Sequence, residues 1–131
     1  MSTYFEQAYE SLNIEQKQAV DTIEGPVMII AGAGTGKTQV IGVRIGKILQ
    51  STQINPESIL CLTFTEAGVT AMRQRLISLI GPSAYRVNIH TFHSFSNEII
   101  QDNPEEFGIQ SGSRPLDEIE RLRILQELIT S

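Results

Sequence analysis

The stretch Ala31-Gly32-Ala33-Gly34-Thr35-Gly36-Lys37-Thr38 decides the fold of this chain. It follows an apolar run at 27–30, which predicts a buried β-strand, and precedes a periodic apolar segment at 39–49, which predicts a helix. Glycines in such a turn let backbone N–H groups point at phosphate oxygens, and the helix N-terminus adds partial positive charge there. The sequence therefore predicts a phosphate-binding loop between a strand and a helix, in an α/β fold.

The lysine and hydroxyl at the end of this loop have defined expected roles. Lys37 is predicted to reach the β- and γ-phosphates of a nucleoside triphosphate, and the Thr38 hydroxyl to ligate Mg²⁺. These two are the candidate catalytic residues, and Thr38 is also the candidate metal ligand. The strict pattern has glycine where Ala31 stands, so a glycine-rich turn that binds nothing is the alternative. The candidate cofactor-binding residues are Gln16, Ala31, Gly32, Ala33, Gly34, Thr35, Gly36, Lys37, Thr38 and Gln39.

The composition is that of an ordinary globular domain. The 131 residues are enough for one core, and 40% hydrophobic with 19% charged residues is close to the average for such domains. No apolar run approaches the roughly 20 residues that span a bilayer, and the polar residues 1–10 do not form a signal peptide. Cys61 lies in an apolar run and is expected to be a buried, reduced thiol. These features predict a cytoplasmic protein without membrane contact.

The net charge of −5 argues against strong DNA affinity from this chain alone, because nucleic-acid binders usually present a basic surface. It leaves room for a local groove within a larger protein.

Strands and helices alternate after the loop. Apolar runs at 59–64 and 87–90 predict two more strands, the first without alternation, as in a parallel sheet covered on both faces. Periodic apolar residues predict helices at 65–80 and 91–101. This order implies crossover connections and a parallel sheet flanked by helices. Side chains expected to face the core include Ile14, Val20, Phe92, Phe95, Ile99 and Ile100. In the predicted 39–49 helix, Gly42 and Gly46 would allow another backbone to approach closely.

The composition changes after residue 101. Residues 102–115 are rich in Gly, Ser, Pro, Asn and Asp and predict a linker. Residues 116–130 predict an amphipathic helix, with Asp117 paired to Arg121 and Glu120 to Arg123. This helix reaches Ser131 without a stop signal, so we expect the chain to be a fragment of a longer protein.

Three stretches outside the loop bear on the ligand, and each leaves two interpretations. The Gln16 amide can bond N6 and N7 of adenine, or it can simply cap its own helix together with Asn13. Phe64 ends the predicted 59–64 strand, at the sheet edge where α/β proteins bind ligands, so it can stack on a base or belong to the core. His90 and His93 lie at the same edge; no Cys or acid stands at ligand spacing, so nucleic-acid contact or a structural role is favoured over a metal.

Together these stretches resemble superfamily 1 DNA helicases of the UvrD/Rep/PcrA type, with some similarity to RecB-type helicase–nucleases. The matching residues are Leu12, Asn13, Gln16, Ala19 and Val20 of the Q motif, residues 31–38 of the phosphate loop, Thr63, Phe64 and Thr65 of motif Ia, and Thr91 to Phe95 of motif Ib. The family's loop usually begins with alanine, which accounts for Ala31. Motif Ia departs from the UvrD-like pattern, which continues with Asn-Lys-Ala-Ala, because this chain has Glu66-Ala67-Gly68-Val69.

The resemblance implies a RecA-like ATP-binding domain, 1A, partly covered by residues 1–101, with 102–115 as a linker and 116–131 as the start of an inserted helical domain, 1B. It implies that ATP and Mg²⁺ are the cofactors, and that the whole protein moves 3′ to 5′ on single-stranded DNA and unwinds duplex at single-strand/double-strand junctions. Its other partners would be the rest of the helicase chain, domains 1B, 2A and 2B. The DNA-binding residues implied are Thr63, Phe64, Thr65, Thr91, Phe92 and His93.

Hydrolysis in that family needs features that the sequence lacks. No apolar strand here ends in the paired acids that hold Mg²⁺ and activate water; Asp117-Glu118 opens a helix, and Glu105-Glu106 lies in the linker. The arginine fingers, worth about 10³-fold or more in turnover, are also missing. We therefore expect this chain to bind nucleotide weakly and to hydrolyse almost none. Two other classes remain open: a small-molecule or nucleotide kinase using the same loop, and a non-enzymatic module that binds ATP or a partner through the 116–130 helix.

Overall fold

A computed structural model describes residues 3–114 and 116–130 of the chain. The chain forms two compact units, residues 1–94 and 95–131, and each is described by itself. The first unit contains α1 (Thr3–Glu10), α2 (Ile14–Asp21), α3 (Lys37–Ser51), η1 (Pro56–Ser58), β1 (Leu60–Thr63), α4 (Glu66–Ile80), η2 (Gly81–Arg86) and β2 (Asn88–Thr91). Helix α5 (Phe92–Asp102) begins in this unit and continues into the second.

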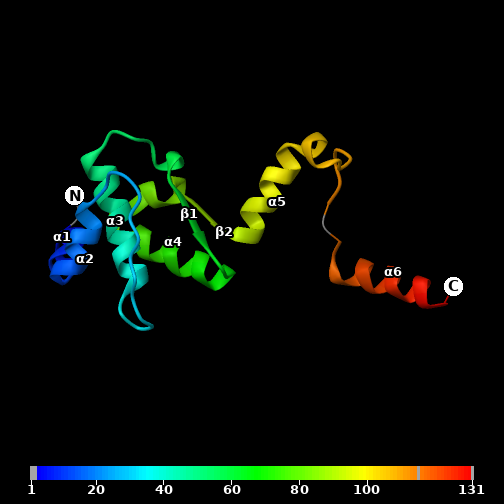
Figure 1. The fold of residues 1–131 in the computed structure, drawn as a ribbon, viewed down its shortest axis with the longest axis horizontal. Helices are drawn as coiled ribbons and strands as arrows, with labels where there is room; N and C mark the ends of the chain where they lie inside the picture. Colours follow the sequence, from blue (N-terminus) through cyan, green and yellow to red (C-terminus); the bar gives the residue numbers. More distant parts are fainter. Residues whose placement is uncertain (1–2, 115, 131) are drawn as a thin grey trace. The chain divides into compact units, whose positions relative to one another are not determined.

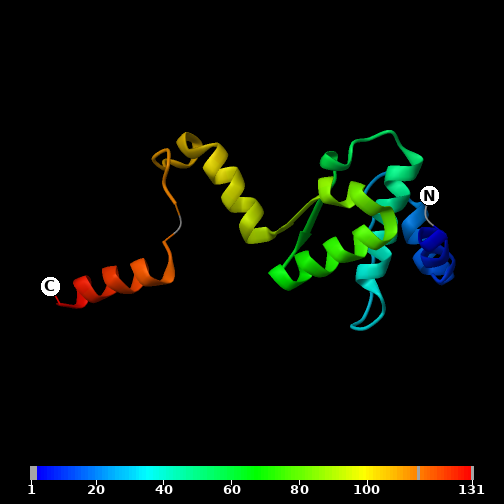
Figure 2. The same cartoon turned by 180° about the vertical axis from the view of Figure 1, so that it is seen from behind.

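The two strands form a parallel sheet, as the alternation of elements predicted. Leu60 pairs with Asn88 and Thr63 with Thr91, so both strands end at the same edge. Helix α4 connects them and packs along them, as Figures 1 and 2 show from opposite sides. The expectation of a strand buried on both faces is wrong for β1, because Leu60 is 43% exposed and the other three residues are half-buried.

The largest difference from the expected fold lies at 27–30. These residues form no strand, and Met28 and Ile30 are 86% and 92% exposed, so the prediction of a buried strand before the loop is wrong. The segment from α2 to α3 runs as an irregular connection (Figure 1). The physical reason is pairing: the described residues form one sheet, in which β1 and β2 bond to each other and neither bonds to 27–30. An apolar segment without a hydrogen-bonded neighbour does not become a strand.

The core of the first unit consists of two apolar clusters around α3 and α4. One gathers Phe5 of α1, Val20 of α2 and Val43 of α3; the other gathers Leu76 of α4 and Val87 before β2. Gly42 and Gly46 permit a close approach, as expected, but side chains of α1 and α4 occupy the space rather than a backbone.

Several residues expected in the core are exposed. Ile14 is 83% exposed at the start of α2, although Val20 of the same helix is fully buried. Phe92 and Ile99 are 44% and 40% exposed, and no residue of α5 is buried. The helix predicted at 91–101 is confirmed as α5, but none of its side chains expected in the core is buried.

The second unit contains the rest of α5, η3 (Pro104–Phe107) and α6 (Glu118–Thr130). The side-chain pairs expected on α6 do not form within residues 116–130. Glu120 instead bonds Arg114, and the Asp117 carboxylate accepts a hydrogen bond from the Glu120 N–H at 2.8 Å. An acid near a helix N-terminus finds backbone donors there, which competes with pairing one turn further along.

In the ranges 3–114 and 116–130, no helix is long and apolar enough to cross a membrane. Cys61 is a free thiol and is half-buried rather than buried.

Candidate functional site

Two glycines with positive φ shape the loop before α3. Gly34 has φ +73° and Gly36 has φ +82°, and a Cβ at Gly34 would meet nothing within 4 Å, so backbone conformation alone requires glycine there. Gly36 is the N-cap of α3, and Lys37 is the first helical residue. The candidate phosphate loop therefore leads directly into a helix N-terminus, which favours anions.

Hydrogen bonds within the loop occupy the carbonyls of Ala31 and Gly32 and leave backbone N–H groups available. The Lys37 ammonium donates to the carbonyls of Ala31 at 3.2 Å and Gly32 at 3.1 Å, and the Thr35 hydroxyl donates to Gly32 at 2.6 Å. Among the residues that the structure describes, the N–H groups of Gly34 and Gly36 meet no acceptor. Unpaired N–H groups at a helix N-terminus, beside the Lys37 ammonium, fit a phosphate chain.

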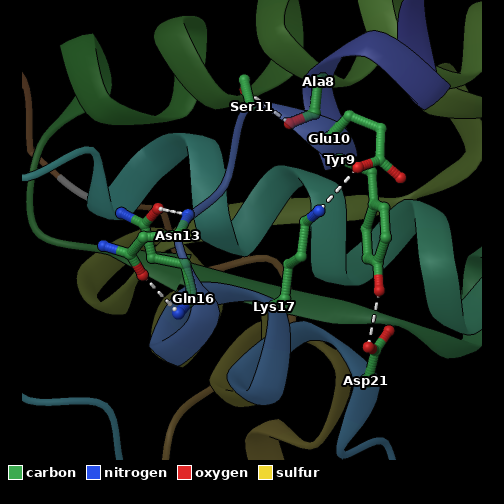
Figure 3. Close-up of polar contacts among 8 residues, drawn as sticks. All are labelled: Ala8, Tyr9, Glu10, Ser11, Asn13, Gln16, Lys17 and Asp21. Carbon is green, nitrogen blue, oxygen red and sulfur yellow. Dashed lines mark hydrogen bonds and ion pairs between the residues drawn. The ribbon is translucent and has the colours of Figure 1, made fainter.

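The amide of Gln16 faces this loop. Asn13 and Gln16 form the expected capping box: the Gln16 N–H donates to Asn13 Oδ1 at 2.8 Å, and the Asn13 N–H donates to Gln16 Oε1 at 3.0 Å (Figure 3). Gln16 Nε2 also donates to the Thr35 carbonyl at 3.1 Å. The helix-capping interpretation is therefore confirmed, and adenine recognition stays a prediction.

A pocket of about 320 Å³ lies where the Q-motif helix meets the loop. This volume is at the low end of the range for small-molecule sites. Its lining combines amide, carboxylate and apolar side chains, with no base-stacking aromatic among them. The lining residues are Asn13, Glu15, Gln16, Ile29, Ile30, Ala31, Gly32 and Thr35.

The remaining residues predicted to hold the cofactor lie at the start of α3. Thr38 is exposed in the first turn, with its hydroxyl unbonded in the described part of the chain. The Gln39 side chain has a buried Oε1 without a hydrogen-bond partner in the same part of the chain. A buried amide oxygen without a donor is costly, and this oxygen lies outside the lining of the pocket beside the loop.

A second group of candidate residues gathers at the ends of β1 and β2. Phe64 follows β1 and Phe92 follows β2, and their ring centroids are 5.1 Å apart at an interplanar angle of 43°. Phe64 is 85% exposed, so the core interpretation of this residue is wrong. Two aromatic rings at an exposed edge offer a face on which a base can stack.

The hydroxyl residues beside these rings cap helices. Thr65 Oγ1 accepts the Gly68 N–H at 3.0 Å and is the N-cap of α4. Thr91 is 5% exposed, and its Oγ1 lies 3.0 Å from both the hydroxyl and the N–H of Ser94. The structure thus brings the motif Ia and Ib residues to one edge, with Thr65 and Thr91 bonded to their own helices and His93 exposed.

Sequence reasoning missed two residues at this edge. Ser94 exchanges four hydrogen bonds with Thr91, and the spacing Thr-x-x-Ser at a predicted helix start is the signal for such a cap. Gly68 is the other: a Cβ there would lie 2.5 Å from the Thr63 hydroxyl, so the Thr63 side chain packs directly against this glycine. No cluster of three or more His, Cys, Asp or Glu within 3–114 or 116–130 is placed to hold a metal ion.

Comparison with known proteins agrees with this arrangement of motifs. The model of the UvrD/REP helicase N-terminal domain matches residues 12–131. The chain belongs to this family. It is 34% identical to the ATP-dependent DNA helicase PcrA of Staphylococcus epidermidis (strain ATCC 35984) over 122 residues, which is 93% of this chain and 17% of that helicase. It is 33% identical to PcrA of Staphylococcus aureus (strain Mu50) over 118 residues, 90% of this chain and 16% of that protein. The chain thus spans about a sixth of the length of these relatives.

Proposed function

We propose that this chain is the ATP-binding N-terminal part of a DNA helicase that couples ATP hydrolysis to 3′–5′ movement on single-stranded DNA and to unwinding at duplex junctions. Residues 1–101 would be a partial RecA-like domain 1A, 102–115 a linker and 116–131 the beginning of domain 1B. The observation that carries the proposal is the loop at 31–38, where the N–H groups of Gly34 and Gly36 are available while the carbonyls of Ala31 and Gly32 are bonded within the loop. Membership of the UvrD/REP family supports it.

Different loop residues would contact different parts of Mg²⁺-ATP. Lys37 would exchange the carbonyls of Ala31 and Gly32 for phosphate oxygens, since its ammonium group is exposed and its present bonds are to neutral acceptors. Thr38 would offer its hydroxyl to the Mg²⁺ that accompanies the nucleotide. Bound Mg²⁺ would neutralise phosphate charge. The paired acids and arginine fingers of the family are absent from this sequence, so we propose that the chain alone turns over almost no ATP.

Calorimetric titration of the chain with ATP and Mg²⁺ tests the nucleotide site. Lys37→Ala should weaken binding tenfold or more, because a charge-assisted hydrogen bond to phosphate is lost. Lys47→Ala is the matched control, since it removes the same charge from the same helix, where Lys47 lies 3.6 Å from Asp21. Equal losses in both variants, or no saturable binding by the wild-type chain, would contradict the proposed site.

The aromatic pair is the proposed contact for single-stranded DNA. Phe64→Ala should weaken binding of a fluorescent oligothymidine at low salt about fivefold or more, given that stacking on one base contributes about 1–3 kcal/mol. Tyr85→Ala is the control, because Tyr85 is 69% exposed and lies in η2, before β2 and so at the opposite edge of the sheet. If both variants bind DNA alike, the aromatic pair is not the DNA contact.

A further inference from the structure

The Gln16 amide is the only side chain from outside residues 31–38 that bonds the loop, within the described parts of the chain. Its Nε2 donates to the Thr35 carbonyl, and a Cβ placed on Gly36 would lie 3.9 Å from the same nitrogen, in ordinary van der Waals contact. Both distances place the Gln16 amide against residues 35–36 of the loop.

The other supports of the loop are local or temporary. The Thr35 hydroxyl bond to Gly32 lies within the loop, and the Lys37 bonds must break if its ammonium is to reach phosphate. The segment before the loop gives no support from a sheet, because 27–30 is unpaired and exposed. Within the described residues, Gln16 makes the one side-chain bond to the loop from outside it, and a phosphate ligand would leave this bond in place because it engages a carbonyl. The Gly36 carbonyl is also bonded from outside the loop, by the helical bond from the Val40 N–H.

Gln16 itself is held firmly enough to act as a support. The capping box fixes its Oε1 on the Asn13 N–H and its own N–H on Asn13 Oδ1 (Figure 3). Helix α2 is in turn bonded to α3, because the Arg44 guanidinium donates to the carbonyls of Ala19 and Thr22. The loop is thus connected to α3 in two ways. It continues directly into α3 at Lys37, and its Thr35 carbonyl is bonded to α2, which is itself bonded to α3.

We propose that Gln16 is a positioning residue for phosphate binding: it holds the phosphate loop in shape through the Thr35 carbonyl, whatever base the ligand carries. This inference rests on the proposed nucleotide site and adds to it. A primary amide has two N–H donors and two acceptor lone pairs, so the bonds to Asn13 and Thr35 leave one of each available to a base. Holding the loop and reading adenine are therefore compatible, and a ligand without a base separates them.

Inorganic tripolyphosphate with Mg²⁺ is that ligand, titrated beside Mg²⁺-ATP by calorimetry. Gln16→Met removes the donor at similar side-chain length and should weaken tripolyphosphate binding about two- to tenfold, as expected for one lost hydrogen bond. ATP binding should weaken by at least the same factor. Gln18→Met is the control on the same helix, where the Gln18 side chain makes no hydrogen bond within the described residues. Asn13→Ala removes the side-chain cap but leaves the Gln16 donor in place, so it reports any effect of fraying in α2.

The outcomes are distinct. If Gln16→Met weakens ATP but not tripolyphosphate, Gln16 acts only on the base, and this inference fails while the proposed site stands. If Asn13→Ala has the same effect as Gln16→Met, helix fraying explains the loss and the inference fails. If the wild-type chain binds neither ligand, the proposed nucleotide site fails as well.

A measurement on the ligand-free chain keeps the inference testable if tripolyphosphate binds too weakly to titrate. Backbone ¹⁵N order parameters of Gly34 and Gly36 should fall in Gln16→Met and remain at wild-type values in Gln18→Met. Unchanged order parameters in Gln16→Met would overturn the inference.

Discussion

Helix α3 meets its neighbours through two glycines, and the tighter of them gives a sharp test of the packing. A Cβ on Gly46 would lie 2.6 Å from Phe5 Cε2, 3.1 Å from Phe5 Cδ2 and 3.2 Å from Ile80 Cγ2. The Phe5 ring is 4% exposed and belongs to the core cluster with Val20 and Val43, so it has no open space into which to move. Gly46→Ala therefore places a methyl group inside a packed core.

Two contributions of opposite sign determine how much Gly46→Ala changes the free energy of unfolding. Replacing glycine with alanine inside a helix stabilises it by about 1 kcal/mol, and overpacking a core costs about 1–3 kcal/mol. Because the 2.6 Å contact is with a rigid, buried ring, we expect the upper half of that range, and Gly46→Ala should lower the free energy of unfolding by about 1–2 kcal/mol. Gly42→Ala is the matched control: its Cβ would lie 3.1 Å from Arg75 Cγ and Leu79 Cδ1, contacts that are longer than the 2.6 Å contact at Gly46 and therefore cost less. Its two contributions should nearly cancel.

Urea denaturation followed by circular dichroism measures both variants. The Phe5→Leu background sharpens the result, because removing the ring should turn Gly46→Ala from destabilising into neutral or stabilising by up to about 1 kcal/mol. If Gly46→Ala is as stable as Gly42→Ala in the wild-type background, α1 does not pack on α3 as described.

Two further predictions concern ionisable groups. Burial raises the pKa of the Cys61 thiol, so alkylation by iodoacetamide at pH 8 should be slower in the folded chain than in urea; equal rates would contradict the burial. The Arg86 guanidinium, 2.6 Å from Glu57, holds the pKa of that carboxyl below its usual value of 4.5. The stabilisation from this pair is therefore complete above that pH and is lost as pH falls through the lowered pKa. Glu57→Gln should flatten the fall in stability on acidification, and an unchanged pH profile would show that the pair does not contribute.

The features that the sequence predicted well are those determined by neighbouring residues. Helix α4 begins at Glu66 because Thr65 caps it, and it ends at Gly81, whose φ of +65° terminates the helix. The capping box of Asn13 and Gln16 follows from their spacing alone. The parallel pairing of β1 and β2 followed from the intervening helix, since a crossover brings the second strand alongside the first in the same direction.

Side-chain partners between elements were harder to predict. Periodicity shows which residues share a face of a helix, but not what covers that face. Ile14 lies on α2 with Val20 and is 83% exposed while Val20 is fully buried, because α3 packs against only part of the helix. Glu120 forms an ion pair with Arg114, which lies outside α6, instead of with Arg123 within the helix. Which side chain becomes buried and which ion pair forms depend on the path of the chain, and a local sequence pattern does not determine that path.

Residues 27–38 contain both kinds of feature. The shape of the loop is determined by neighbouring residues, whereas a strand at 27–30 depends on a partner elsewhere in the chain. Val27, Ile29 and Ile30 have high β-propensity, yet a strand requires hydrogen bonds to a neighbour, and the described residues give 27–30 none. The loop needs no such neighbour. Its shape comes from glycines that accept positive φ, from the Thr35 hydroxyl that donates to the Gly32 carbonyl, and from the helix that begins at Lys37. The loop therefore takes its shape without a paired strand before it, and the contact from Gln16 to the Thr35 carbonyl is the support that we propose in place of that strand.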